Sequence, residues 1–402
     1  MIQQALEDAH RREWGFVLAA TVRVTRDLDL AEECVQDAFA KAVTAWQDEV
    51  PAKPGAWLTT VARNRALDVL RREQHLQRLL PLLVEDEVIP EEHPDLLRLV
   101  FTCCHPSLAL ESQVALTLRL LCGLSTADVA KAFLVSEPTM AARITRAKKK
   151  IAQARIPYRV PDPEELPARV DAVLAVLHLL FTTGHTAPTG DQLVREDLVQ
   201  RALDLARMLH ALLPTPEVSG LLALILLSHA RRSTRVAPDG SLLLLEHQDR
   251  SQWDRAVLDE GLLLVRGALQ QGRPGRYALQ AAIAAVHADA TTYDETDWRE
   301  IAALYALLQA HWPSPVVALN RAVAIGLGAG PEAGLRALAT LDDEPTLAAY
   351  SYFPAARADF LRRLGRTREA RTAYEEALLL TENEVERSFL EGRLSGLDAD
   401  RA

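Results

Sequence analysis

The sequence predicts an all-α protein. Its 402 residues are 49% hydrophobic and 25% charged, a composition typical of soluble globular chains long enough for two or three domains. Apolar residues recur at helical spacing along most of the chain, and Leu242–Leu245 is a short apolar run that fits either a strand or a buried loop. Neither a signal-peptide core nor about 18 consecutive apolar residues occurs. We therefore expect a cytoplasmic protein that has no membrane contact.

A first amphipathic helix is predicted within residues 30–46. Its apolar stripe runs from Ala31 to Ala42 at helical spacing, and polar side chains occupy the opposite face and its edge. Glu33, Gln36 and Asp37 lie on this polar face, and Glu32 lies at its edge.

A second amphipathic helix, within residues 55–73, follows a break at Pro51 and Pro54. One side is apolar, the other side is polar and rich in arginine, and the tryptophan at the helix start is placed to stack on a base. A solvated helix face and a core tryptophan are the structural alternatives. The candidate nucleic-acid contacts are Trp57, Arg63, Asn64, Asp68, Arg71 and Arg72.

The clearest functional pattern is a helix-turn-helix within residues 111–151. Gly123 is a candidate C-cap, Ser125 and Ser136 are candidate N-caps, and Pro138 is tolerated in the first turn of the last helix. That helix has an apolar stripe at positions 140, 144, 147 and 151, opposite a cationic face. Such a helix fits the major groove of DNA, whereas a helical hairpin with a solvated basic face is the alternative. Its candidate DNA contacts are Ser136, Thr139, Arg143, Arg146 and Lys149.

Charge is distributed unevenly between this helix and the rest of the chain. The net charge is −10, yet residues 136–155 hold six Lys or Arg and one acid. A basic helix on an acidic body disfavours indiscriminate DNA binding by the isolated protein, because phosphate neutralisation supplies most non-specific affinity. Residues 85–95 hold six acids and no Lys or Arg, and two prolines keep that segment extended. A solvated linker is one interpretation of this segment.

Residues 158–402 are predicted to be an irregular helical repeat domain. Four prolines between 157 and 167 mark its start. Ala370, Tyr374 and Ala377 form the small-large-small set of a tetratricopeptide repeat, and Glu332-Ala333 stands 37 residues before Glu369-Ala370. The proline expected after the second helix is absent, so an irregular solenoid is predicted. Helices are expected near 168–182, 194–213, 217–231, 251–271, 277–290, 296–311, 315–327, 331–341, 354–364, 367–380 and 384–396.

No catalytic, metal or cofactor site is predicted. Adjacent Cys103 and Cys104 are poor partners for tetrahedral zinc, and with no CxxC in the sequence, buried thiols are favoured over a metal or redox role. Motifs such as HExxH, GxSxG and phosphate-binding glycine loops are also missing. The polar segments 182–186 and 247–254 are interpreted as turn or docking elements.

The order of these segments resembles a known family. DLAEECVQDAFAKAVTAW, AWLTTVARNRALDVLRR and the helix-turn-helix together resemble extracytoplasmic function sigma factors of the sigma-70 family. HQDRSQWD (His247–Asp254), SPVVALNRAVA (Ser314–Ala324) and RADFLRRLGRTREA (Arg357–Ala370) resemble the subgroup with a long C-terminal tetratricopeptide-like extension. The resemblance implies sigma region 2 in residues 1–80, a linker in 81–96, region 4 in 97–157 and the extension in 158–402.

The resemblance also implies partners and roles. Region 2 would dock on the β′ clamp helices of core RNA polymerase through Glu32, Glu33, Gln36 and Asp37, whose exposed carboxylates would meet basic residues of that helix pair. The loop 46–57 and the arginine-rich helix after it would recognise and open the −10 promoter element, and the 136–149 face would read the −35 element. The β flap is a further polymerase contact, and the acidic linker would run toward the RNA exit path. The extension would regulate the protein in cis, docking on the sigma domains or on another protein.

Two other classes remain open at this stage. One is a helix-turn-helix regulator whose C-terminal half senses a ligand, but such a regulator needs neither the acidic face nor the arginine-rich helix. The other is a helical-repeat adaptor that binds only proteins, which would not need the basic recognition helix.

Overall fold

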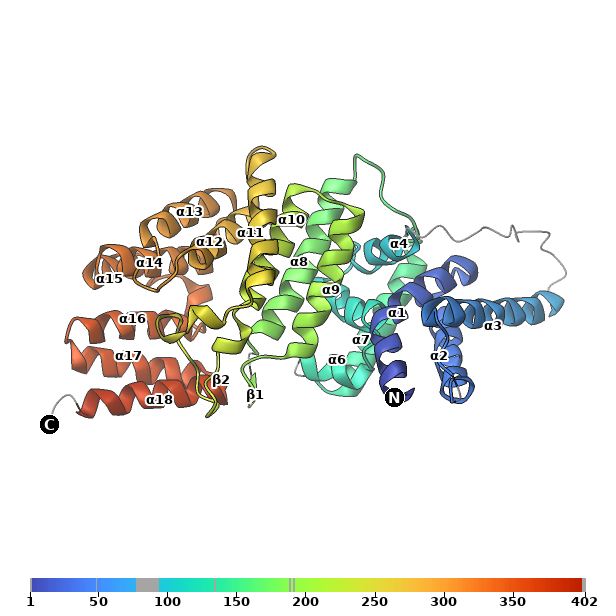
Figure 1. Cartoon of the computed structure of the whole chain (residues 1–402), viewed down its shortest axis with the longest axis horizontal. Helices are drawn as coiled ribbons and strands as arrows, with labels where there is room; N and C mark the ends of the chain where they lie inside the picture. Colours follow the sequence, from blue (N-terminus) through green and yellow to red (C-terminus); the bar gives the residue numbers. More distant parts are fainter. Residues whose placement is uncertain are drawn as a thin grey trace. The chain divides into compact units, whose positions relative to one another are not determined.

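The computed structural model describes residues 2–47, 49–76, 94–133, 135–187, 189–190 and 192–399. The chain forms two compact units, Met1–Leu179 and Leu180–Ala402 (Figure 1). In the described residues, paired strands are limited to β1 (Thr189–Gly190) and β2 (Glu382–Asn383), which are parallel, with Thr189 opposite Glu382. The all-α fold is therefore confirmed. The predicted acidic linker lies outside the described residues up to residue 93.

The first unit begins with three packed helices, α1 (Ile2–Thr25), α2 (Leu28–Ala45) and α3 (Pro54–Leu76). The carboxylate of Asp27 starts α2 by accepting hydrogen bonds from the backbone N–H groups of Asp29 and Leu30. The apolar stripe predicted for α2, together with Leu58 and Ala62 of α3, is buried. The polar faces of α2 and α3 are therefore turned away from this core.

The second part of this unit is the predicted helix-turn-helix. Its elements are α4 (Pro94–Cys103), α5 (Leu110–Leu116), a π-helical turn η1 (Thr117–Leu121), α6 (Thr126–Ala132) and α7 (Glu137–Gln153). Gly123 has a φ of +69°, which suits glycine at a helix end. The hydroxyl of Ser125 accepts a bond from Asp128 N–H and donates to its carboxylate. The predicted caps on both sides of the turn are confirmed.

Helix α8 (Leu166–His185) contains the division between the two units, whereas the sequence places the start of the extension at residue 158. Residues 158–179 belong to the first unit and pack against its earlier helices. The Tyr158 hydroxyl lies 2.8 Å from the Ala19 carbonyl oxygen, and Arg169 donates to the Phe101 carbonyl. By length and apolar composition α8 alone among the described helices is suited to cross a membrane. Its Val173, Leu174 and Leu177 side chains are buried in the protein.

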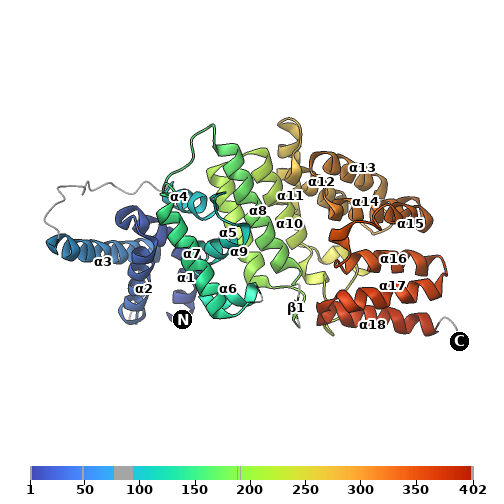
Figure 2. The same ribbon diagram turned by 180° about the vertical axis from the view of Figure 1, so that it is seen from behind.

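The second unit is a series of packed helices, and Figure 2 shows them from behind. Every helix that the sequence predicts in it is present, with ends within a few residues of those expected. They are α9 (Glu196–Leu212), α10 (Pro216–His229), α11 (Arg255–Gln270), α12 (Arg276–Asp289), α13 (Trp298–His311), α14 (Pro315–Ala329), α15 (Pro331–Ala339), α16 (Tyr352–Arg363), α17 (Thr367–Leu380) and α18 (Glu384–Ala399).

Repeat-like packing holds the end of this unit together. Figure 1 shows α16, α17 and α18 side by side, and Ala370, Tyr374 and Ala377 are buried between them. A side chain at Gly326 of α14 or Gly334 of α15 would overlap the Phe360 ring, so both glycines allow helices to approach closely. The small-large-small pattern of α17 thus predicted the residues that pack against its neighbouring helices.

The two polar segments of the extension lie at helix ends: residues 182–185 are the last turn of α8, and 250–252 form a short 3-10 turn before α11. In residues 247–254, Arg250 donates to the carbonyls of His287 (2.8 Å) and Ala290 (2.7 Å), and Asp254 caps α11. At the end of α8, Arg235 donates to the His185 carbonyl and to the Thr186 hydroxyl. The run Leu242–Leu245 is a half-buried loop with one bridge, from Leu242 to Val236. These contacts cap and join helices within the extension, and only the 247–254 segment is a turn between helices, as predicted.

Candidate nucleic-acid interface

The recognition helix α7 separates a buried side from an exposed cationic side. Met140, Ile144, Ala147 and Ile151 are buried, as the stripe predicts. On the opposite side the predicted contacts Thr139, Arg146 and Lys149 are exposed, and Arg143 is half-buried with its guanidinium 5.4 Å from the centre of the Phe133 ring. The helix therefore presents cations to solvent from a fixed scaffold.

Hydroxyl groups form the start of α7. The Oγ of Ser136 accepts a 3.4 Å bond from Thr139 N–H, and the two hydroxyls lie 2.8 Å apart. Pro138 stands in the first turn, where its missing N–H costs nothing. Both hydroxyl residues are exposed at the helix N-terminus, where backbone N–H groups favour an anion such as phosphate.

Helix α3 carries the second predicted surface. Asn64, Asp68, Arg71 and Arg72 are exposed, and Arg63 is half-buried. Trp57 is in the first turn, half-buried, with its ring edge-on to the buried Trp46 ring at 5.6 Å. The structure thus brings the predicted −10 residues onto one helix, with the tryptophan partly engaged in the core.

Arg65, which is not among the predicted contacts, joins α3 to α2. Arg65 Nε lies 2.8 Å from an Asp37 carboxylate oxygen, and its Nη2 lies 3.9 Å from Glu33. The hydrogen bond to Asp37 raises the pKa of Arg65. Asp37, a predicted polymerase contact, is therefore already paired with Arg65 within the protein.

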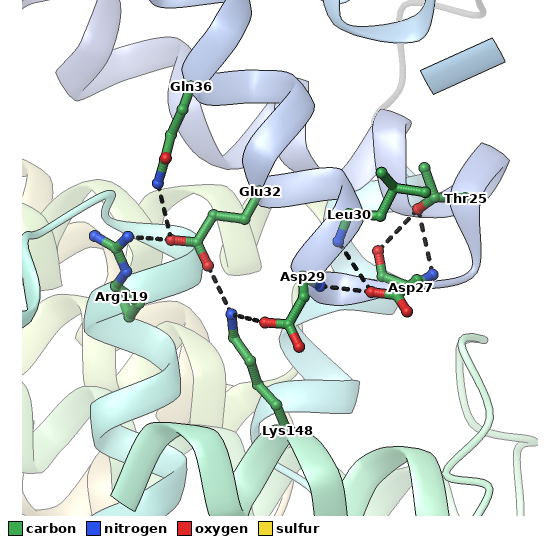
Figure 3. A network of polar contacts seen from close by, with 8 residues as sticks. All are labelled: Thr25, Asp27, Asp29, Leu30, Glu32, Gln36, Arg119 and Lys148. Atoms are coloured by element: carbon green, nitrogen blue, oxygen red, sulfur yellow. Dashed lines mark hydrogen bonds and ion pairs between the residues drawn. The ribbon is translucent and has the colours of Figure 1, made fainter. Parts of the chain in front are cut away.

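One sequence expectation on α2 is wrong. The resemblance implies an exposed Glu32 carboxylate, but the residue is 6% exposed. Its carboxylate accepts bonds from Arg119 of η1, from Lys148 of α7 at 2.7 Å and from Gln36 at 3.3 Å (Figure 3). Glu32 stands at the edge of the apolar stripe, and there α2 meets the helix-turn-helix. Glu33 and Gln36 are exposed as predicted.

The four cysteines are buried thiols. Burial raises the pKa of Cys103 well above its usual value and that of Cys104 to about 12, so both stay protonated at neutral pH. Cys104 Sγ lies 3.6 Å from the Thr117 hydroxyl. Among the described residues, no group of three His, Cys, Asp or Glu is arranged to hold a metal ion.

A small cavity of about 190 Å³ lies in the extension between the 244–246 loop and α16. Its lining is mostly apolar, and its charged groups are paired with one another: Arg363 lies 2.7 Å from Asp359 and 3.5 Å from Glu246. The cavity therefore offers no isolated charged group to a ligand.

Family models match three parts of the chain. Sigma-70 region 2 matches residues 9–76, and Sigma-70, region 4 matches residues 98–151. A family of unknown function (DUF6596) matches residues 169–269, in the extension. The first two matches cover the α2–α3 and α7 surfaces described above.

Similarity extends along the whole chain in one relative. "Uncharacterized protein R00370" of Rhizobium meliloti (strain 1021) is 41% identical over 399 residues, which cover 96% of this chain and 94% of the relative. No solved structure matches the chain significantly. The two sigma regions, the helical extension behind them and their order along one chain show that this protein belongs to the extracytoplasmic function sigma factors with a C-terminal extension, which recognise promoters in transcription initiation.

Proposed function

We propose that the protein docks on core RNA polymerase through α2 and reads two promoter elements, the −10 element with α3 and the −35 element with α7. The observation that carries this proposal is the pair of exposed polar and cationic faces, on α3 and α7, in one chain that also has an acidic helix. The polymerase contacts would be the β′ clamp helices for Glu33, Gln36 and Asp37, and the β flap for region 4. Such a protein works in the cytoplasm, with the chromosome.

On the −10 element, the proposed role of α3 is to hold a base that has left the duplex. Extruding a base costs a few kcal/mol, which stacking and polar contacts must offset. Trp57 supplies an aromatic surface and Asn64 an amide that can pair with a base edge, while Arg71 and Arg72 are free of the core and suit the phosphates.

On the −35 element, α7 would enter the major groove. Arg143 and Arg146 would pair bidentately with guanine, which is worth about 1–3 kcal/mol of discrimination each. Thr139, Ser136 and Lys149 would contact phosphates and set the position of the helix on the duplex.

The test is promoter-directed transcription. The full-length protein is added to purified core polymerase with a DNA library randomised at both promoter elements, and the transcripts are sequenced. We expect enrichment of a two-part sequence that core polymerase alone does not select. Transcripts identical to those of core polymerase alone would refute the proposal, and they would leave a ligand-sensing regulator or a protein-binding adaptor as the alternatives.

We also propose that the extension regulates the protein in cis. A tethered domain has an effective concentration of about 1 mM, so weak docking on a sigma region shifts its population. A chain shortened to end at Ala187 is the test, because it keeps Tyr158 and Arg169, which pack on the first unit. We expect the shortened chain to differ from the full chain in transcript yield or promoter choice. Equal activity of a shortened chain that circular dichroism shows to be folded would exclude the idea.

A further inference from the structure

Four charged side chains link α2 to the helix-turn-helix. Lys148 Nζ of α7 lies 2.7 Å from an Asp29 carboxylate oxygen and 2.7 Å from the Glu32 carboxylate, and Arg119 of η1 pairs with the other Glu32 oxygen. We call these four residues, Asp29, Glu32, Arg119 and Lys148, the ion network. Figure 3 shows that both cations reach the same face of α2 from the helix-turn-helix.

The ion network is shielded from water at its centre. The side chains of Glu32, Lys148 and Arg119 are 8%, 11% and 17% exposed, whereas Asp29 is open to solvent. Burial alone lowers the pKa of Lys148, but the neighbouring carboxylates raise it above its ordinary value, so the ammonium stays charged. A buried pair depends on both partners, because removing one leaves an uncompensated charge.

Secondary structure fixes both sides of the network. On α2, the Asp27 cap holds the first turn, which carries Asp29, and Glu32 lies one turn further on. On the other side, Arg119 also donates a 2.8 Å bond to the Leu124 carbonyl in the turn of the helix-turn-helix. The π-helical turn that contains Arg119 is a rare geometry that redirects side chains and is frequent at functional positions.

The ion network lies where α2 meets η1 and α7, and it leaves the cationic face of α7 exposed. Glu32 belongs to the acidic set that the family resemblance assigns to polymerase docking, and here its two oxygens are already paired within the chain. Arg146 and Lys149, which flank Lys148 along α7, remain exposed. A closed arrangement of this kind therefore withholds Glu32 from polymerase and leaves the cationic face of α7 accessible to DNA.

We propose that the ion network holds the free protein in a closed state in which Glu32 is withheld from core polymerase while the recognition helix stays accessible to DNA. This inference rests on the proposed function of α2. In the docked state, basic residues of the polymerase replace Arg119 and Lys148 as partners of the acidic face. The measured polymerase affinity is the affinity of the open state multiplied by the fraction of protein that is open. Couplings of this kind typically change affinity about 5- to 150-fold.

Lys148→Glu in the full-length protein is the variant that tests this inference. It places a carboxylate against Asp29 and Glu32 and alters no residue of the acidic docking set. Lys150→Glu is the matched control, because it makes the same charge change two residues along α7, at an exposed position that contacts the Ser107 carbonyl of the same region. Any general effect of the added negative charge on DNA binding is common to both variants.

Two readouts are measured on each protein. Spin labels at exposed positions 43 and 152 report the distance between α2 and α7, and the four native thiols are buried, which confines labelling to the introduced cysteines. Titration of core polymerase reports affinity. We expect a short, narrow distance in the wild type and the control, and a longer, broader one in Lys148→Glu. Polymerase affinity should rise about 5- to 150-fold in Lys148→Glu alone. Addition of polymerase should lengthen the wild-type distance.

Two results would overturn the inference while the proposed function stands: an unchanged distance in folded Lys148→Glu, or a longer distance without a gain in polymerase affinity. Lys148→Met, which keeps the apolar stem and removes the charge, replaces Lys148→Glu if the latter fails to fold by circular dichroism. Failure of the proposed function has a different signature, because no variant and no wild-type protein would then direct transcription from selected promoters. That outcome refutes both.

Discussion

Replacing Arg143 and Arg146 together with alanine is expected to lower affinity for the selected −35 duplex by about 30-fold or more. Each guanidinium that pairs with guanine is worth about 1–3 kcal/mol, so two lost pairs amount to at least about 2 kcal/mol. Non-promoter DNA should be affected less, since only base contacts carry sequence information. Fluorescence anisotropy of full-length protein on both duplexes at fixed salt measures the effect.

The control for this experiment is Lys150→Ala, on the same helix but outside the predicted DNA face. Lys149→Ala adds a further comparison, because loss of a phosphate contact weakens both duplexes alike and reduces the slope of log affinity against log salt by about 1. If the double arginine variant kept its full preference for the selected duplex, α7 would not be the helix that recognises the −35 element.

Asn383→Ala is expected to lower the free energy of unfolding of the extension by about 3 kcal/mol or more. Asn383 is fully buried, and its amide nitrogen donates to the carbonyls of Ala187 (3.0 Å) and Gln192 (2.9 Å). Its amide oxygen accepts from the N–H groups of Val385 and Glu386 at the start of α18. A buried polar group left without a partner costs about 1–3 kcal/mol, and this substitution leaves several.

Chemical denaturation followed by circular dichroism measures this loss. The matched control is Asn320→Ala on α14, which removes an exposed amide and should change stability by less than about 0.5 kcal/mol. If the two variants unfolded at the same denaturant concentration, the Asn383 contacts would have no role in holding the extension together.

Local patterns predicted much of the fold and the exposed cationic face of α7. The caps at Ser125 and Ser136 and the stripe of α7 depend on residues within one or two helical turns, and both are present in the structure. The same holds for the helices of the extension and for the buried set around Tyr374. Helical periodicity states which side of a helix is buried, and that information lies entirely in nearby residues.

Glu32 shows where this reasoning fails. Its partner Lys148 is 116 residues away along the chain, and periodicity on α2 places Glu32 only at the edge of the apolar stripe. A glutamate at such an edge is equally compatible with solvent and with a distant cation. Arg119 lies in a π-helical turn, whose geometry the α-helical pattern does not describe. The ion network is therefore visible only once the helices are placed in space.

The contacts of Asn383 explain why the proline expected after α17 is absent. A tetratricopeptide pattern expects proline near residue 382, but Glu382–Asn383 forms the strand β2 and Asn383 caps α18. The role of position 383 requires a side-chain amide, which proline lacks. The sequence departs from the repeat pattern here because Asn383 caps α18 and bonds to the Ala187 carbonyl.

The hydrogen bonds from Asn383 to Ala187 and Gln192 span 196 and 191 residues of sequence, and this separation sets an order of events during synthesis. A ribosome must release nearly the entire polypeptide before these bonds form, whereas residues 1–179 have left the exit tunnel long before. The promoter-reading regions can thus mature on the nascent chain ahead of the completed extension. Translation itself provides an interval in which regions 2 and 4 exist without a completed extension.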